Sequence, residues 1–291
     1  MIKSMTGFGI AAKDFANAKY TVEIKSLNSK FLELALKLPK SFSDKELILR
    51  NECSKYIERG KVTIAFNIEY PESDKKAALI DTALLKLYYN QLKDTAQELG
   101  DSSSNLLQLA LTFPDVIHSN DELVSDEEWQ QLHSAFSEAL ENFQKFRKDE
   151  GNILEKDLVL RVTNILTALK QVEELEPRRI PAIKDRINQL LNEYVGKENV
   201  DQNRFEQELI FYIDKLDITE EKVRLKSHCD YFLKALKSPD ANGKKLGFIS
   251  QEIGREINTM GSKANDAGIQ QVVVGMKEEL EKIKEQLLNV L

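Results

Sequence analysis

The segment from Ser125 to Glu176 restricts the fold more than any other part of the chain. It contains no proline and one glycine, Gly151, and it opens with Ser125-Asp126-Glu127-Glu128, a helix-capping signature. Apolar residues then recur at helical spacing from Trp129 to Phe146. One helix of this length, or two helices that meet at Gly151, would give an extended body and not a globular one.

The N-terminal part of the chain has a period of two instead. Apolar and polar residues alternate over Tyr20–Lys25, Leu32–Leu38 and Lys61–Tyr70. This is the pattern of half-buried strands, and the turn at Ser26–Lys30 is expected to join the first two of them. A sheet with one wet face alternates in this way, whereas a fully buried parallel sheet does not. The pattern therefore predicts a small α+β domain with an antiparallel sheet and a helix that begins near Ser43 and ends before Gly60.

The rest of the chain has helical periodicity. Further helices are expected over residues 81–99, 105–112, 183–194, 203–236 and 246–266, followed by an apolar seam from Ala267 to Leu287. The predicted fold class is α+β, a small N-terminal antiparallel-sheet domain followed by a long, mostly helical region. The expected divisions are an N-terminal α+β domain at 1–75, a helical scaffold and oligomerisation region at 76–202, and a C-terminal helical domain at 203–291.

Charge is unevenly distributed along the 291 residues, whose net charge is −7. Residues 1–71 carry +4, residues 72–202 carry −10 and residues 203–291 carry −1. The acidity lies in the middle of the chain. A polyanion would therefore approach the two ends.

Several classes of protein are disfavoured. No apolar run approaches the about 20 residues of a membrane-spanning helix, and the N-terminus lacks the apolar core of a signal peptide, so we expect a cytoplasmic protein without a membrane partner. Cys53 and Cys229 have no CxxC spacing, which argues against a disulfide framework and a structural zinc site. Walker A, GxGxxG, GxSxG and HExxH motifs do not occur.

The most unusual stretch is Leu246–Asp266. As a helix it has an apolar stripe formed by Leu246, Ile249, Ile253, Ile257 and Met260. The opposite stripe carries Glu252, Arg255, Glu256, Thr259, Ser262, Lys263 and Asp266. Such a face can hold a metal or a phosphate. An ion-pair ladder between subunits or domains is the alternative, and helix physics alone favours it because structural ion pairs are more frequent than functional ones.

Two other polar groupings allow similar alternatives. On the preceding helix, charged residues and a histidine share one arc: Asp217, Glu220, Glu221, Arg224 and His228. A single histidine is more often a satisfied structural residue than a catalyst. The turns with Lys25, Asn28, Ser29 and Lys30 and with Arg59-Gly60-Lys61 suit phosphate oxygens, and they equally suit ordinary solvated turns.

Five motifs resemble the bacterial YicC-like proteins. They are SMTGFG at 4–9, EIKSLNSKFLEL at 23–34, ERGKV at 58–62, NRFEQEL at 203–209 and GKKLGFISQEIGREINTMGSKAND at 243–266. The resemblance covers nearly the whole chain, although residues 72–200 match mainly in helical character. It implies an endoribonuclease of bacterial RNA turnover that depends on a divalent cation and assembles as a homo-oligomeric ring or clamshell, with six subunits expected. Other RNA-turnover proteins are further expected partners.

The leading hypothesis is metal-assisted hydrolysis of RNA by carboxylates that hold Mn²⁺ or Mg²⁺. The candidate metal ligands are Glu208, Asp217, Glu252 and Glu256, and the candidate catalytic residues are His228, Glu252 and Glu256. The candidate RNA-binding residues are Lys25, Asn28, Lys30, Arg59, Lys61, Arg224, Arg255 and Lys263. Attack by the RNA's own 2′-hydroxyl, without metal, is an alternative chemistry. A non-catalytic oligomeric RNA-binding adaptor is the alternative function, and a purely structural oligomer is disfavoured because the basic turns would then have no role.

Overall fold

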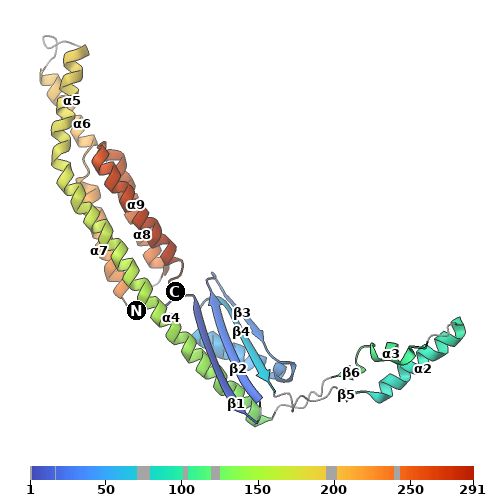
Figure 1. Ribbon diagram of the computed structural model, residues 1–291. Helices are drawn as coiled ribbons and strands as arrows, with labels where there is room; N and C mark the ends of the chain where they lie inside the picture. The colour runs from blue at the N-terminus through green and yellow to red at the C-terminus, as the bar shows by residue number, and fades with distance from the viewer. Residues whose placement is uncertain are drawn as a thin grey trace.

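The computed structural model describes residues 2–16, 18–70, 79–100, 104–118, 125–194, 202–238 and 243–291. Its strands are β1 (Gly7–Phe15), β2 (Ala18–Leu27), β3 (Leu32–Lys37), β4 (Gly60–Glu69), β5 (Leu79–Ile80) and β6 (Ile117–His118). Its α-helices are α1 (Glu46–Tyr56), α2 (Thr82–Leu99), α3 (Leu106–Leu111), α4 (Asp126–Leu175), α5 (Arg179–Tyr194), α6 (Gln202–Lys215), α7 (Thr219–Lys237), α8 (Gly243–Ala264) and α9 (Ala267–Leu287). Short 3₁₀ helices η1 (Lys40–Lys45) and η3 (Glu176–Arg178) precede α1 and α5. A small sheet domain followed by a mostly helical region confirms the α+β class (Figure 1).

The N-terminal sheet has the order β1-β2-β4-β3. β2 pairs antiparallel with β1 and with β4, but β3 pairs parallel with β4. The expectation of a wholly antiparallel sheet with β2 and β3 joined as neighbours was therefore wrong. η1 and α1 form the crossover that a parallel pair requires, and this crossover places β4 between β2 and β3.

The helix α4 is continuous and spans 50 residues. It begins with the expected capping box, in which Ser125 Oγ accepts from Glu128 N and the Glu128 carboxylate accepts from Ser125 N. Gly151 does not interrupt the helix. A side chain there would meet the backbone of Ile2, since an added Cβ would lie 2.2 Å from Ile2 O, so the glycine allows a close approach and not a bend.

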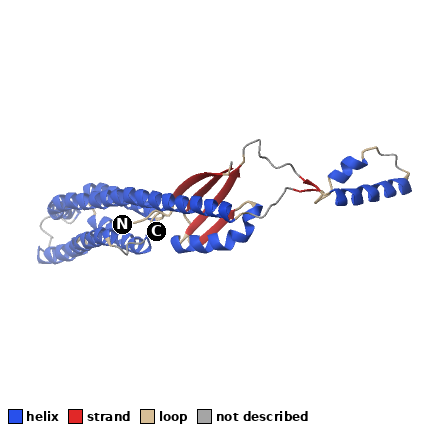
Figure 2. Cartoon of the chain, turned by 90° about the horizontal axis from the view of Figure 1, so that it is seen from below, coloured by secondary structure: helices blue, strands red, loops and turns tan. Residues whose placement is uncertain are grey.

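The two ends of α4 belong to two different hydrophobic cores. Its first part covers β1 and β2, and its second part packs with α7, α8 and α9, as Figure 2 shows for the long helix that runs from the sheet into the bundle. At the sheet, α4 approaches β1 closely because Gly7 and Gly9 present no side chain to Phe143 and Ala139. The cores are thus not distributed as the divisions at residues 75 and 202 suggest, because one helix contributes to both.

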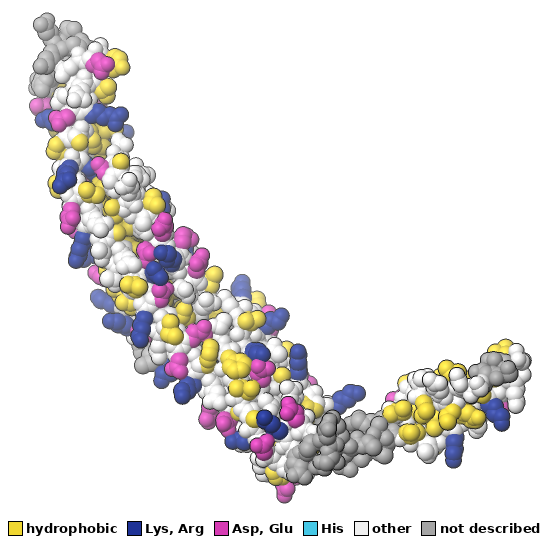
Figure 3. All heavy atoms as spheres, in the orientation of Figure 1, with side chains coloured by type: hydrophobic (Ala, Val, Ile, Leu, Met, Phe, Trp, Pro, Cys, Tyr) yellow, Lys and Arg dark blue, Asp and Glu magenta, His cyan; other side chains and the backbone are white. Residues whose placement is uncertain are grey.

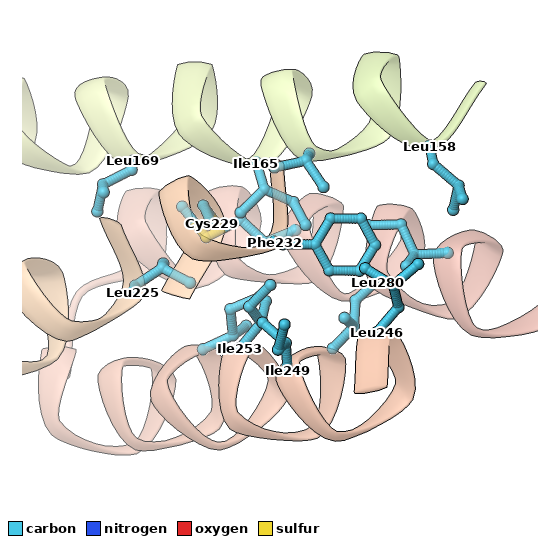
Figure 4. Packing of buried hydrophobic residues seen from close by; sticks show 14 of the residues in the cluster. Leu158, Ile165, Leu169, Leu225, Cys229, Phe232, Leu246, Ile249, Ile253 and Leu280 are labelled. Carbon is cyan, nitrogen blue, oxygen red and sulfur yellow. The ribbon is translucent and has the colours of Figure 1, made fainter. Parts of the chain in front are cut away.

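The bundle core is formed by apolar stripes on four helices (Figure 4). Phe232 and Leu225 of α7 lie between α4 and the stripe of α8. The five predicted apolar residues of α8 are all buried, which confirms that stripe. The single helix expected over residues 203–236 is wrong: the structure has two helices, α6 and α7, separated by a turn at residues 216–218. In this turn the Asp217 carboxylate accepts from Thr219 N (3.1 Å), the first residue of α7.

The sheet domain and the bundle meet at a junction formed by both end segments of the chain. Ser4 forms a β-bridge with Val290, and Met5 N donates to Asn289 O (2.8 Å). The Arg147 side chain of α4 is buried below this bridge, and its Nε donates to Ser4 O (2.7 Å). Figure 1 shows the two ends side by side between the sheet and the helices.

A separate small unit contains α2, α3 and the β5–β6 pair. Asp81 and Gly100 bound α2 as the N-cap and the C-cap, which confirms the expected helix. Figure 3 shows a gathering of hydrophobic side chains on this unit. Exposed apolar residues of the unit are Ile80, Leu87, Leu99, Leu107, Leu109, Phe113 and Ile117.

None of the described helices combines the length and the apolar character that crossing a membrane requires.

Candidate active site

The candidate site lies along the seam between α7 and α8. These helices are consecutive, and the start of α7 contacts the end of α8 through Glu221 and Lys263, so they run antiparallel. Leu225, Cys229 and Phe232 of α7 face the core together with the stripe of α8. The polar side chains at the edges of these two stripes therefore meet along one line.

An ion pair closes one end of the seam. Lys263 Nζ lies 2.9 Å from Glu221 Oε1, and Glu221 is only 5% exposed. The other oxygen, Glu221 Oε2, has no hydrogen-bond partner among the described residues. The hydrogen bond that Lys263 donates to Glu221 raises the pKa of Lys263, and nearby acidic groups add to this effect. Lys263 therefore neutralises a buried carboxylate that still has hydrogen-bonding capacity, which is a costly arrangement in a protein interior.

His228 and Glu256 lie at the same level of the seam. His228 follows Glu221 by seven residues, and Glu256 precedes Lys263 by seven residues. Seven residues correspond to about two helical turns. In antiparallel helices these two steps lead to the same position. Glu256 is 5% exposed and His228 is half-buried, so both side chains lie at the rim of the core.

The outer residues of the seam are accessible. Glu252 and Arg255 are exposed on α8, and neither forms an ion pair with another described residue. Arg224 is also exposed, but it pairs with Glu220 one turn earlier in α7. These charges border the position of His228 and Glu256 on the solvent side.

A second charged group lies where α8 ends. The side chain of Arg179, at the start of α5, is 6% exposed and donates from Nη2 to Leu216 O (2.7 Å) and Lys263 O (3.3 Å), the carbonyls at two helix ends. Lys222 pairs with Glu176 beside it. This group fixes the α6–α7 turn and the end of α8 to the end of α4.

Asp217 has a structural position. Its carboxylate accepts from the hydroxyl and the backbone N–H of Thr219, at 2.7 Å and 3.1 Å. These hydrogen bonds, with the positive charges of Lys263 and Lys222, hold the pKa of Asp217 below its ordinary value. The residue precedes Ile218, the N-cap of α7, and its carboxylate binds the first residue of that helix. These contacts do not support a role as a metal ligand.

The four candidate metal ligands do not converge within one chain. The described residues contain no group of three or more His, Cys, Asp or Glu side chains placed to hold a metal ion. Glu208 is exposed on α6, Asp217 is bound to Thr219 in the α6–α7 turn, and Glu256 is buried while Glu252 is exposed. The donor set predicted from the sequence therefore does not fit a cation site built by a single subunit.

The N-terminal basic residues divide into two groups. Asn28 Nδ2 donates to Leu288 O and Arg59 Nη2 donates to Val290 O, both at 2.7 Å, so these two side chains hold the junction together. Lys25, Lys30 and Lys61 are exposed. Lys25 pairs with Glu23 (2.6 Å), and Lys30 lies over the ring of Phe31.

The sequence pattern was not used to predict that Glu221 is buried, and Arg179 was not named as a candidate residue. A signal for both exists in the spacing. Glu221 is in phase with Leu225 and Cys229 on the apolar stripe of α7, and Arg179 is in phase with Ile183 on α5. A charged residue within an apolar stripe is a candidate for burial.

The chain is similar to known proteins over almost its whole length. The family description "Endoribonuclease YicC-like, N-terminal region" matches residues 2–156, and "Endoribonuclease YicC-like, C-terminal" matches residues 172–291. Two relatives, each named "Probable endoribonuclease YicC", come from Clostridioides difficile (strain 630) and Haemophilus influenzae (strain ATCC 51907 / DSM 11121 / KW20 / Rd). Each is 31% identical to this chain, over 293 and 296 residues, and each alignment covers 100% of both proteins. The chain therefore belongs to the YicC-like endoribonuclease family.

Proposed function

We propose that this protein is an endoribonuclease that cleaves RNA phosphodiester bonds in bacterial RNA turnover, with its active site on the α7–α8 seam. The proposal is carried by the position of His228 and Glu256 at one level of the seam, each about two helical turns along its helix from the Glu221–Lys263 pair. Membership of the family supports the reaction class. We expect the protein to act in the cytoplasm, as an enzyme of RNA turnover does.

The residues of the seam supply the two proton transfers of the reaction. One group removes the proton of the attacking oxygen, and the other protonates the 5′-oxygen that leaves. His228 and Glu256 are the two groups available at one level of the seam. Arg255 and Lys263 lie along the same face and would bind the phosphate whose charge increases during the reaction.

The proposal is tested with His228→Ala and Glu256→Gln on a fluorescently labelled RNA. General acid–base groups contribute about 10²- to 10⁴-fold, so each change is expected to lower kcat/KM by at least about a hundredfold. His133→Ala is the matched control, because His133 pairs with Glu52 in the sheet domain (2.9 Å) and is remote from the seam. Equal activity of His228→Ala and His133→Ala would show that the seam is not the active site.

Metal dependence stays a prediction, and the nature of the product ends decides it. Hydrolysis leaves a linear phosphate, whereas attack by the 2′-hydroxyl leaves a 2′,3′-cyclic phosphate and a 5′-hydroxyl. RNA is incubated with the protein in Mn²⁺, in Mg²⁺ and in EDTA, and the ends are identified by mass spectrometry. Cyclic ends formed in EDTA would contradict the metal-assisted reaction.

A homo-oligomeric ring, with six subunits expected, completes the proposal. The exposed apolar side chains of the α2–α3 unit support self-association, since monomeric proteins rarely expose large apolar patches (Figure 3). Leu107→Ser with Leu109→Ser is expected to lower the mass measured by light scattering. An unchanged mass would place the subunit contacts elsewhere.

The alternative is a non-catalytic RNA-binding adaptor whose charged seam is structural. The buried Glu221–Lys263 pair favours it, because structural ion pairs also occupy such positions. Glu252→Gln with Glu256→Gln separates the two functions. Loss of cleavage with retained oligomeric mass supports the enzyme, whereas loss of assembly in a protein that never cleaves RNA supports the adaptor.

A further inference from the structure

A pocket of about 420 Å³ lies at the far end of the bundle, beyond the α7–α8 seam. It is bordered by α5, by Tyr212 of α6 and by the α8–α9 turn at Asn265 and Asp266. Its volume lies in the range of small-ligand sites. The pocket includes Asn265 and Asp266, the last two residues of the motif at 243–266. The proposed active site gives these two residues no role.

One wall of the pocket is apolar. Ile183, Ile187 and Leu190 of α5 line it at spacings of four and three, so they share one face of the helix. Tyr212 lines the pocket from α6, and it is 41% exposed. An apolar wall with an accessible aromatic ring suits a flat aromatic group such as a nucleobase.

The other wall carries polar groups that the backbone holds in place. Arg179 is fixed by its hydrogen bonds to Leu216 O and Lys263 O, yet its Nε has no partner among the described residues. Asp266 Oδ1 accepts from Ile269 N (2.9 Å) and caps α9. Asn265 adopts a positive φ of 43° in the turn. Groups fixed in this way lose little conformational freedom when a ligand binds.

Arg186 completes the pocket with a positive charge. It lies two turns after Arg179, on the same face of α5, and it is exposed. Within the described ranges, no acidic side chain forms an ion pair with it. Its guanidinium is therefore available to a phosphate, which it can bind with two parallel hydrogen bonds.

We propose that this pocket binds one unstacked nucleotide of single-stranded RNA, with the base against Tyr212 and the α5 wall and the phosphate on Arg186. Asp266 has a second carboxylate oxygen that can accept from a ribose 2′-hydroxyl. The inference rests on the proposed function, because it assigns this nucleotide to the same RNA that the seam cleaves. Lys263 connects the two places: its side chain belongs to the seam and its carbonyl binds Arg179, and the level of Glu256 is about 10 Å away along α8.

The binding test uses a fluorescein-labelled octaribonucleotide with phosphorothioate linkages and with 2′-O-methyl groups on alternate nucleotides only, which slows cleavage and leaves 2′-hydroxyl groups that can donate to Asp266. Arg186→Ala is expected to raise Kd about tenfold through loss of a charged hydrogen bond, and to reduce the slope of log Kd against log salt by about 0.7. Arg178→Ala removes an exposed arginine that does not line the pocket, and it is the matched control. Equal effects of the two changes would overturn the proposal, since they would reflect charge alone.

A cross-linking experiment locates the base directly. An RNA octamer with one 4-thiouridine is irradiated with the full-length protein, and cross-linked peptides are identified by mass spectrometry. Cross-links to α5 or to the peptide with Tyr212, lost in Arg186→Ala, support the pocket. Cross-links confined to the sheet domain would overturn the proposal. A change in oligomeric mass in Arg186→Ala without a change in Kd would also overturn it, and would assign the pocket to contact with a second copy of the chain.

These results are separable from the proposed function. Normal cleavage by wild type with unchanged Kd in Arg186→Ala refutes the nucleotide pocket and leaves the endoribonuclease intact. Cross-linking at Tyr212 in a protein that cleaves no RNA supports the pocket and refutes the endoribonuclease.

Discussion

The two cores that share α4 bury different kinds of side chain. At the sheet, α4 covers an apolar surface formed by residues such as Tyr20, Ile24 and Phe66. In the bundle, the buried set also contains Glu221, Glu256 and Arg179. Burying a charge is unfavourable unless it is paired, and Glu221 and Arg179 meet this requirement through Lys263 and through two backbone carbonyls. The bundle therefore buries charged side chains that need specific partners, whereas the sheet core relies on apolar packing.

The junction makes this comparison sharper. Arg147 is also fully buried, but it lies between the two cores, where its Nε donates to Ser4 O. Asn28 and Arg59, two residues predicted to bind RNA, contact backbone carbonyls of the same junction. A basic residue near a turn can thus serve the connection between domains and leave phosphate binding to the other cations.

The largest predicted effects come from creating a cavity in either core. Phe136→Ala in the sheet core and Phe232→Ala in the bundle core are each expected to lower the free energy of unfolding by about 3–5 kcal/mol. Alkylation of Cys53 and Cys229 during denaturant unfolding reports on the two cores separately, because burial raises the pKa of each thiol to about 12 and protects it in the folded protein. We expect each change to expose both thiols together, since α4 is common to both cores. Labelling of Cys229 well before Cys53 in Phe232→Ala would show that the cores are independent.

The next effect concerns the buried charge of the bundle. Lys263→Met leaves Glu221 without its partner and is expected to lower the free energy of unfolding by about 3 kcal/mol. Arg224→Ala, which breaks the exposed pair with Glu220, should change it by about 0.5 kcal/mol or less. Urea denaturation measures both. If Glu221→Gln combined with Lys263→Met is no more stable than Lys263→Met alone, the uncompensated carboxylate is not the cause.

A smaller effect tests the close approach of α4 to the sheet. In Gly9→Ala the new Cβ would lie 2.3 Å from Ala139 O, so we expect a loss of about 2 kcal/mol. Gly247→Ala is the matched change in α8, where an added Cβ meets no atom within 4 Å, and it should stabilise the protein by about 0.5–1 kcal/mol. Thermal unfolding measures the two shifts in Tm. Shifts of the same sign would contradict the assigned packing.

The smallest effect is a pH dependence at the start of α7. The folded-state pKa of Asp217 is lowered, so its contribution to stability is present above the ordinary pKa near 3.8 and is lost as the pH falls through the lower folded value. Asp217→Asn keeps an oxygen that can accept from Thr219 and should reduce the loss of stability below about pH 4. The free energy of unfolding of both proteins is compared at pH 3 to 6, conditions that we choose to span this range. Parallel curves for wild type and Asp217→Asn would show that the group does not titrate differently on folding.

Much of the local structure could be predicted from spacing alone. The alternation in β2 and β4, the caps of α2 and α4 and the apolar stripe of α8 all depend on residues within a few positions of each other. The charged face of α8 was also predicted, and within it Glu252 and Arg255 are exposed. The spacing indicates that Glu221 is a candidate for burial, but it does not indicate which helix buries it. Glu256 and Glu221 are buried where α7 and α8 meet, and the break at Asp217 that begins α7 was missed.

The sequence by itself determined which elements form and which face of each is apolar, because backbone sterics, capping and periodicity act over a few residues. Only the tertiary structure decided that β4 lies between β2 and β3, that α4 serves two cores, and that Asn28 and Arg59 hold the junction. It also paired Glu221 with Lys263, 42 positions later in the chain. The physical reason is that an apolar face specifies burial without specifying its partner. The partner follows from the packing of the whole chain.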